Sequence, residues 1–129
     1  MDWNKVLHWN QEESEDLRFV GYSYLKQGAY DIALTIFKAL VAIHPKNPYD
    51  LQTLGAIYLQ LGNSLESLYF LDRALALVPD HYPSLLNRAK VLFLLGRKRQ
   101  AYLQSKELEK CIDPYIAKKA AALSATYGK

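Results

Sequence analysis

The sequence predicts an all-α fold: three helix–turn–helix repeats in a row, closed by a C-terminal capping helix. A glycine recurs at a fixed step of 34 residues, at Gly28, Gly62 and Gly96. Other residues keep the same step, among them the pairs Gly21 and Gly55, Tyr24 and Tyr58, and Pro45 and Pro79. A period of this length with glycine and proline punctuation is typical of stacked helix pairs. Such arrays usually bind other polypeptides and rarely catalyse reactions.

Size and composition predict one domain over residues 1–129. Half of the residues are hydrophobic, which is enough to pack a core. The single cysteine, Cys111, can form no intrachain disulfide, which fits a reducing compartment. No apolar run approaches the roughly 18 residues that span a bilayer, and the N-terminus lacks the pattern of a signal peptide. We therefore expect a cytoplasmic chain without direct membrane insertion.

The first repeat is predicted over residues 15–47. Its helices are expected at about 15–26 and 31–43, with Asp31 as the N-cap of the second. Gly28 lies in the turn between them, where a left-handed backbone favours glycine. Pro45 then ends the repeat, because proline cannot continue a helix.

The later repeats follow the same plan over residues 48–81 and 82–114. Expected helices cover about 49–61, 83–95 and 98–110, and a further helix runs from the turn 62–64 to about 77, with Ser64 as a possible N-cap. The closing proline of the third repeat, Pro114, comes one residue late. It opens the alanine-rich capping helix, expected at about 115–126 within the C-terminal segment 115–129.

The N-terminal segment, residues 1–14, contains two tryptophans. Helical spacing places Trp3, Val6 and Leu7 on one face, and the polar stretch 10–14 is expected to separate this piece from the array. Trp3 and Trp9 could pack on the first repeat as a cap, fold back over the groove of the array, or dock onto a second copy and form a homodimer.

These residues resemble the tetratricopeptide repeat, a family that builds right-handed superhelical arrays. The resemblance covers about residues 17–114 and is specific in the first two copies. The first copy supplies Gly21, Tyr24, Gly28, Ala33, Phe37 and Pro45, and the second supplies Leu54, Gly55, Tyr58, Gly62, Ala74 and Pro79. The third keeps Ala89, Gly96 and Ala101 but has Arg88 and Leu92 where leucine and tyrosine would stand. Small residues at Gly21, Gly55 and Ala89 are expected where paired helices cross closely.

A narrower resemblance is to the bacterial type III secretion chaperones that hold translocator or needle subunits. It rests on residues 24–33 and 54–56 and on three repeats followed by one helix. The resemblance implies a chaperone that keeps a secreted client soluble by holding an extended client segment in the concave groove. The alternative is a generic adaptor that joins proteins in a complex without chaperone activity.

The concave surface of such an array is formed by the first helix of each repeat. Helical spacing gives the candidate partner-binding residues Arg18, Tyr22, Leu25, Lys26, Tyr49, Gln52, Thr53, Ala56, Gln60, Asn87, Lys90 and Phe93. Apolar groups with scattered amides suit an extended peptide, whose backbone needs hydrogen-bond partners. The same periodicity would let Leu25, Leu59, Leu86 and Phe93 pack between repeats instead.

Several other functions are not expected. A clamp for acidic chaperone tails needs convergent cations and amides. Among the positions that would form such a clamp, only Arg18 has a suitable side chain. The charge is −2 over residues 1–50 and +5 over 51–129, without the basic stripe of a nucleic-acid binder. His8, His44 and His81 lack metal-ligand spacing, and no catalytic motif is present. We therefore expect neither an enzyme nor a metal or cofactor.

Overall fold

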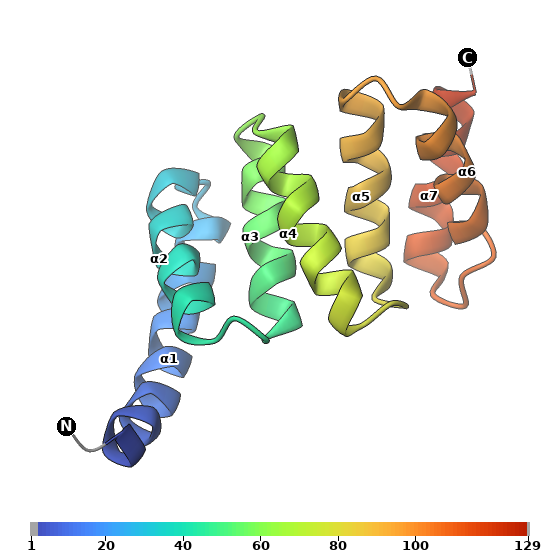
Figure 1. Cartoon of the computed structure of the whole chain (residues 1–129). Helices are drawn as coiled ribbons and strands as arrows, with labels where there is room; N and C mark the ends of the chain where they lie inside the picture. The colour runs from blue at the N-terminus through green and yellow to red at the C-terminus, as the bar shows by residue number, and fades with distance from the viewer. Residues whose placement is uncertain (1–2, 129) are drawn as a thin grey trace.

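The computed structural model describes residues 3–128, with side chains from residue 12 onward. Within this range the chain forms seven α-helices and no strand (Figure 1). The helices are α1 (Trp3–Lys26), α2 (Tyr30–Ile43), α3 (Pro48–Gln60), α4 (Ser64–Leu77), α5 (Tyr82–Leu94), α6 (Lys98–Leu108) and α7 (Pro114–Tyr127). Each helix packs on the next along the chain, and α5 also contacts α3 and α7. The predicted all-α array of helix pairs with a terminal helix is confirmed.

Helix α1 is longer than the sequence predicts. It begins at Trp3 and not near residue 15, and it continues through the polar stretch 10–14 without a break. The expectation that this stretch separates two pieces is therefore wrong. Residues 3–20 contain no glycine or proline, and glutamate and glutamine are good helix formers, so nothing stops the helix there. The side chains of Trp3, Val6, Leu7 and Trp9 lie outside the described residues.

The three recurring glycines close the three helix pairs in the same way. Gly28, Gly62 and Gly96 have φ of 76°, 82° and 82°, in the left-handed region that favours glycine. In each turn the backbone N–H that follows the glycine donates to a carbonyl in the last turn of the preceding helix, at 2.8 to 2.9 Å. This bond satisfies a carbonyl that the helix end would otherwise leave without a partner. The predicted conformation of these glycines is confirmed.

The helix caps differ from the prediction. Asp31 lies in the first turn of α2, and Ser64 is the first residue of α4, so neither is the N-cap. Side-chain caps occur instead where a helix begins after the loop that follows a helix pair. Asn47 Oδ1 accepts the N–H groups of Tyr49 and Asp50 at 3.0 and 3.1 Å, and Asp113 Oδ1 accepts that of Tyr115 at 2.9 Å. Each of these caps precedes a proline, which suits the first helical position.

Small residues allow the paired helices to cross closely. A Cβ atom added to Gly21 would lie 2.7 Å from the ring of Phe37, and one added to Gly55 would lie 2.8 Å from Leu71. At the second crossing, Ser67 Oγ donates to the Gly55 carbonyl at 2.7 Å. Phe37 and Tyr58 are buried in the core around these crossings.

The buried residues form one larger cluster over α2–α4 and two smaller clusters toward the C-terminus. Leu86 packs with Leu108, Ile116 and Ala120, so it belongs to the contact between helices and not to the concave surface. Cys111 is half-buried at the edge of the same cluster. Helix α7 thus completes the core of the third repeat.

Candidate functional site

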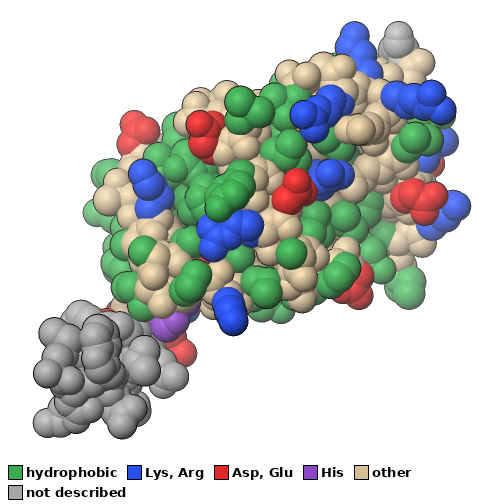
Figure 2. Space-filling view, in the orientation of Figure 1, with side chains coloured by type: hydrophobic (Ala, Val, Ile, Leu, Met, Phe, Trp, Pro, Cys, Tyr) green, Lys and Arg blue, Asp and Glu red, His purple; other side chains and the backbone are tan. Residues whose placement is uncertain are grey.

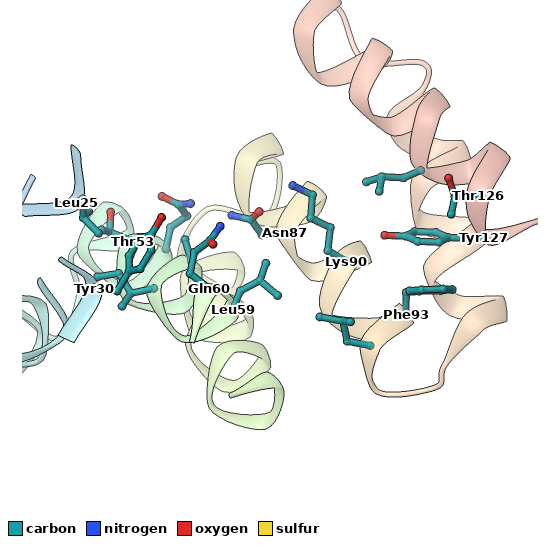
Figure 3. Close-up of a pocket in the computed structure, with 15 residues that line it drawn as sticks. Leu25, Tyr30, Thr53, Leu59, Gln60, Asn87, Lys90, Phe93, Thr126 and Tyr127 are labelled. Atoms are coloured by element: carbon teal, nitrogen blue, oxygen red, sulfur yellow. The ribbon is translucent and has the colours of Figure 1, made fainter. Parts of the chain in front are cut away.

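A groove of about 490 Å³ runs along the inner side of the array (Figure 3). Helices α1, α3, α5 and α7 and the start of α2 form its walls. Most lining residues come from α3 and α5, the first helices of the second and third repeats. The lining residues are Leu25, Tyr30, Gln52, Thr53, Ala56, Ile57, Leu59, Gln60, Asn87, Lys90, Phe93, Leu94, Leu123, Thr126 and Tyr127. A hollow of this size, apolar with a few polar groups, has the composition of a ligand site.

Eight of the twelve predicted site residues lie together in this groove. They are Leu25, Gln52, Thr53, Ala56, Gln60, Asn87, Lys90 and Phe93. The other four, Arg18, Tyr22, Lys26 and Tyr49, lie outside its lining. The helical spacing within the first helix of each repeat therefore brings most of the predicted residues to one surface. Helical spacing alone does not distinguish the residues that line the groove from the residues on the surface beside it.

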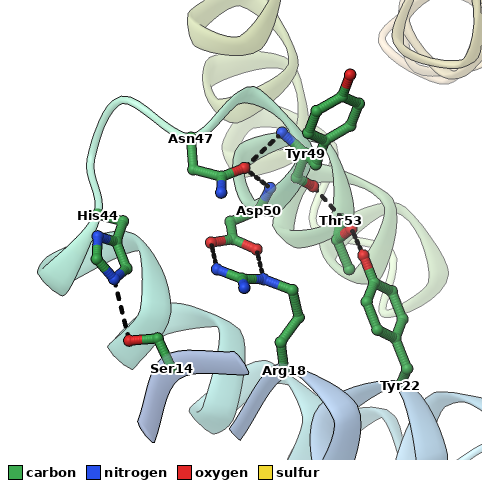
Figure 4. A network of polar contacts seen from close by, with 8 residues as sticks. All are labelled: Ser14, Arg18, Tyr22, His44, Asn47, Tyr49, Asp50 and Thr53. Carbon is green, nitrogen blue, oxygen red and sulfur yellow. Dashed lines mark hydrogen bonds and ion pairs between the residues drawn. The ribbon is translucent and has the colours of Figure 1, made fainter. Parts of the chain in front are cut away.

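Arg18 is engaged inside the fold (Figure 4). Its Nε and Nη2 donate to the two carboxylate oxygens of Asp50, each at 2.7 Å, so α1 and α3 are joined by a bidentate ion pair. The Asp50 side chain is fully buried, and that of Arg18 is 22% exposed. The hydrogen bond to Asp50 is the main cause that raises the pKa of Arg18. The guanidinium is thus already paired with a partner of its own chain.

The two predicted tyrosines lie outside the groove lining, in different surroundings. The hydroxyls of Tyr22 and Thr53 are 3.2 Å apart, and the Tyr22 ring meets the buried Phe37 edge-on. Tyr49 is 60% exposed and lies against the ring of His81. Lys26 is exposed at the end of α1. Tyr22 therefore contacts the groove lining at Thr53, whereas Tyr49 lines a second hollow together with Arg18.

The histidines with described side chains make local contacts. His44 Nε2 lies 3.0 Å from Ser14 Oγ, and His81 Nδ1 lies 2.6 Å from Ser84 Oγ. Burial lowers the pKa of His81. Among the described residues, no three His, Cys, Asp or Glu side chains come together as metal ligands would. The side chain of His8 lies outside the described residues.

The sequence missed the contribution of α7 to the groove. Leu123, Thr126 and Tyr127 form its C-terminal wall, where the Tyr127 ring stacks on Phe93 with 4.5 Å between centroids. Burial raises the pKa of Tyr127. The signal was present in the spacing of Ile116, Ala120, Leu123 and Tyr127, which marks an inward stripe on the helix. The sequence predicts only a capping role for this helix.

Basic residues do not gather on the face drawn in Figure 2. Lysine and arginine side chains there are interspersed with hydrophobic patches and acidic groups. Arg88 and Arg18 are both paired with aspartates. No continuous cationic stripe of the kind that follows a phosphate backbone is visible on this face.

Comparisons with known proteins support the repeat interpretation. A family model of the tetratricopeptide repeat matches residues 20–47. A BBSome complex member, BBS4 of Bos taurus, is 34% identical over 85 residues, which is 64% of this chain. This chain spans only 10% to 16% of the length of the curated relatives that it matches. The similarity is therefore confined to a small part of each of those longer proteins.

Solved structures match nearly the whole array. PcrH of Pseudomonas aeruginosa, in complex with the chaperone binding region of PopD, has a TM-score of 0.83 with 19% identity over 92% of both chains. The translocator chaperone SycD of Yersinia enterocolitica has a TM-score of 0.84 with 14% identity over 92% of this chain and 85% of its own. At such identities the likeness shows the fold alone. The chain therefore contains a tetratricopeptide repeat and has the tetratricopeptide-repeat fold along its length.

Within the described residues, no helix is both long enough and apolar enough to cross a membrane.

Proposed function

We propose that this tetratricopeptide-repeat chain holds an extended segment of another protein in its concave groove. The observation that carries the proposal is the groove itself, in which apolar walls alternate with amide side chains. Leu59 and Phe93 offer apolar contacts, and Gln52, Gln60 and Asn87 offer donors and acceptors for a peptide backbone. An extended chain presents both kinds of group, so it fits this lining better than a folded surface does.

The more specific form of the proposal is a type III secretion chaperone that keeps a secreted client soluble in the cytoplasm. Its support is the likeness of the whole array to PcrH and SycD, which were solved in complex with the chaperone binding region of PopD and with a peptide of the translocator YopD. The mechanism would be passive. Apolar side chains of the client would be buried against groove residues, and the amides would satisfy the client backbone, so fewer client surfaces remain free to aggregate.

The second candidate is an adaptor that joins proteins in a complex. It is favoured by the match to part of a protein named as a member of the BBSome complex. Both candidates use the groove, but only the chaperone acts on the solubility of its partner. Co-expression separates them, because a chaperone raises the soluble fraction of the client and an adaptor binds a partner that is already soluble.

A large side chain placed in the groove is expected to abolish the increase in client solubility that co-expression with the chaperone gives. Ala56 is a half-buried lining residue of α3, so in the Ala56→Tyr variant a large side chain would occupy the space of the client. The matched control is Ala76→Tyr, on an exposed position of α4 outside the lining. We expect at least about a tenfold loss of client affinity for the first variant, since burial of one large apolar group is worth more than 1.4 kcal/mol, and little change for the second.

The measurement is the soluble yield of a candidate translocator subunit co-expressed with each variant. Circular dichroism of the purified variants checks that both still fold. Equal rescue by folded Ala56→Tyr and by the control would place the client on another surface and remove the proposal.

A further inference from the structure

Lys90 is the one charged side chain among the described residues that line the groove. It is half-buried in the middle of α5, with Asn87 one turn before it. Figure 3 shows the Lys90 amino group and the Asn87 amide at the centre of the groove. A single cation in an otherwise uncharged hollow selects the charge of whatever fills the hollow.

Within the described part of the chain, Lys90 has no charged partner. The ion pairs there join Arg18 to Asp50, Arg88 to Asp72, and two lysine–glutamate pairs on α6 and just after it. The equivalent places in the first two repeats hold Tyr22 and Ala56. The cation is therefore specific to the third repeat and is not needed for the packing that the repeats share.

Apolar walls lie on both sides of this charge. On one side are Leu25, Tyr30 and Leu59, and on the other are Phe93 and Tyr127 (Figure 3). A segment that passes over Lys90 would therefore bury apolar side chains before and after it. The same segment would cover the ammonium and displace its water, which costs free energy unless an anion takes the place of the water.

We propose that the bound segment has an acidic side chain flanked on both sides by apolar residues, with the carboxylate on Lys90 and Asn87. This inference rests on the proposed function, because it requires a peptide in the groove. A carboxylate accepts from the ammonium and from the amide NH₂ at once, and such charge-assisted hydrogen bonds are stronger than neutral ones. A lysine or arginine at the same place of the segment is disfavoured by like charge.

The test uses a synthetic array of peptides of about ten residues, blocked at both ends so that no terminal charge contributes. Leucine or phenylalanine flanks a central glutamate, glutamine or lysine, and matched peptides carry serine in place of the flanking apolar residues. The array is probed with the full chain, with Lys90→Met, with Lys90→Glu and with Lys38→Met. Lys38 is exposed on α2 outside the groove, so its removal changes the net charge equally without touching the site.

We expect the chain and Lys38→Met to prefer the glutamate peptides over the glutamine peptides by on the order of tenfold. Lys90→Met should lose this preference while it retains binding to apolar peptides, and Lys90→Glu should prefer the lysine peptides. Binding that requires flanking apolar residues but ignores the central charge would overturn the inference and leave the proposed function standing. A lack of binding to every peptide would overturn both.

Discussion

Replacing Arg18 with alanine is expected to lower the free energy of unfolding by about 3 kcal/mol, because it leaves the carboxylate of Asp50 buried without its partner. The Asp50 side chain has no exposed surface, and both of its oxygens accept from Arg18 at 2.7 Å. Once the guanidinium is removed, the carboxylate must remain desolvated, take up a proton, or open the contact between α1 and α3. Urea unfolding followed by circular dichroism measures the loss.

A double variant separates the missing partner from the lost packing. Arg18→Met with Asp50→Leu removes both charges and keeps apolar volume between α1 and α3. Its stability should lie within about 1 kcal/mol of the parent chain, since apolar residues can replace a buried ion pair at little cost. A double variant as unstable as Arg18→Ala would contradict this account, because the loss would then occur without an unpaired buried charge.

Replacing Phe37 with alanine is expected to destabilise the fold by about 3–5 kcal/mol through loss of apolar burial and formation of a cavity. Phe37 has no exposed surface, and its ring lies against Gly21 and Tyr22 at the crossing of α1 and α2. The matched control is Phe19→Ala on the same helix pair, where the ring is 73% exposed. This second change should alter stability by no more than about 0.5 kcal/mol.

The same urea unfolding experiment compares the two phenylalanine variants. Similar losses for both would show that the crossing at Gly21 does not organise the first repeat, contrary to the packing described above. A large loss confined to Phe37→Ala would show that the small residue at position 21 and the large one at position 37 form one packed unit.

The regular part of the fold could be predicted because it depends on local chemistry. A glycine at φ near +80° and a proline after each helix pair follow from backbone sterics, and both recur visibly in the sequence. The caps at Asp31 and Ser64 were predicted wrongly because α2 and α4 begin earlier than expected, so that Ala29 and Asn63 are the N-caps, and sequence does not fix a helix boundary to the residue. The length of α1 was missed because polarity was interpreted as a boundary, although glutamate and glutamine favour helix.

The site was predicted in part for a similar reason. Helical spacing identifies a face, so it brought residues such as Gln52, Ala56 and Lys90 together. It could not show that Arg18 is paired with Asp50, since the two are 32 residues apart in sequence and meet only because α1 and α3 both pack on α2. The spacing on α7 marks an inward stripe that includes Leu123 and Tyr127, but that this stripe meets the groove depends on how the last helix packs on α5.

The central claim is that the partner lies in the groove, and site-specific photo-crosslinking tests it most directly. A benzophenone amino acid is placed at Gln60 or Leu94, which are exposed groove positions, and at Leu65 or Leu103, which are exposed positions of α4 and α6 outside the lining. Each variant is co-expressed with the client and irradiated. We predict client adducts from positions 60 and 94 and none from 65 and 103. Adducts from 65 and 103 alone, or equal adducts from all four positions, would contradict the claim.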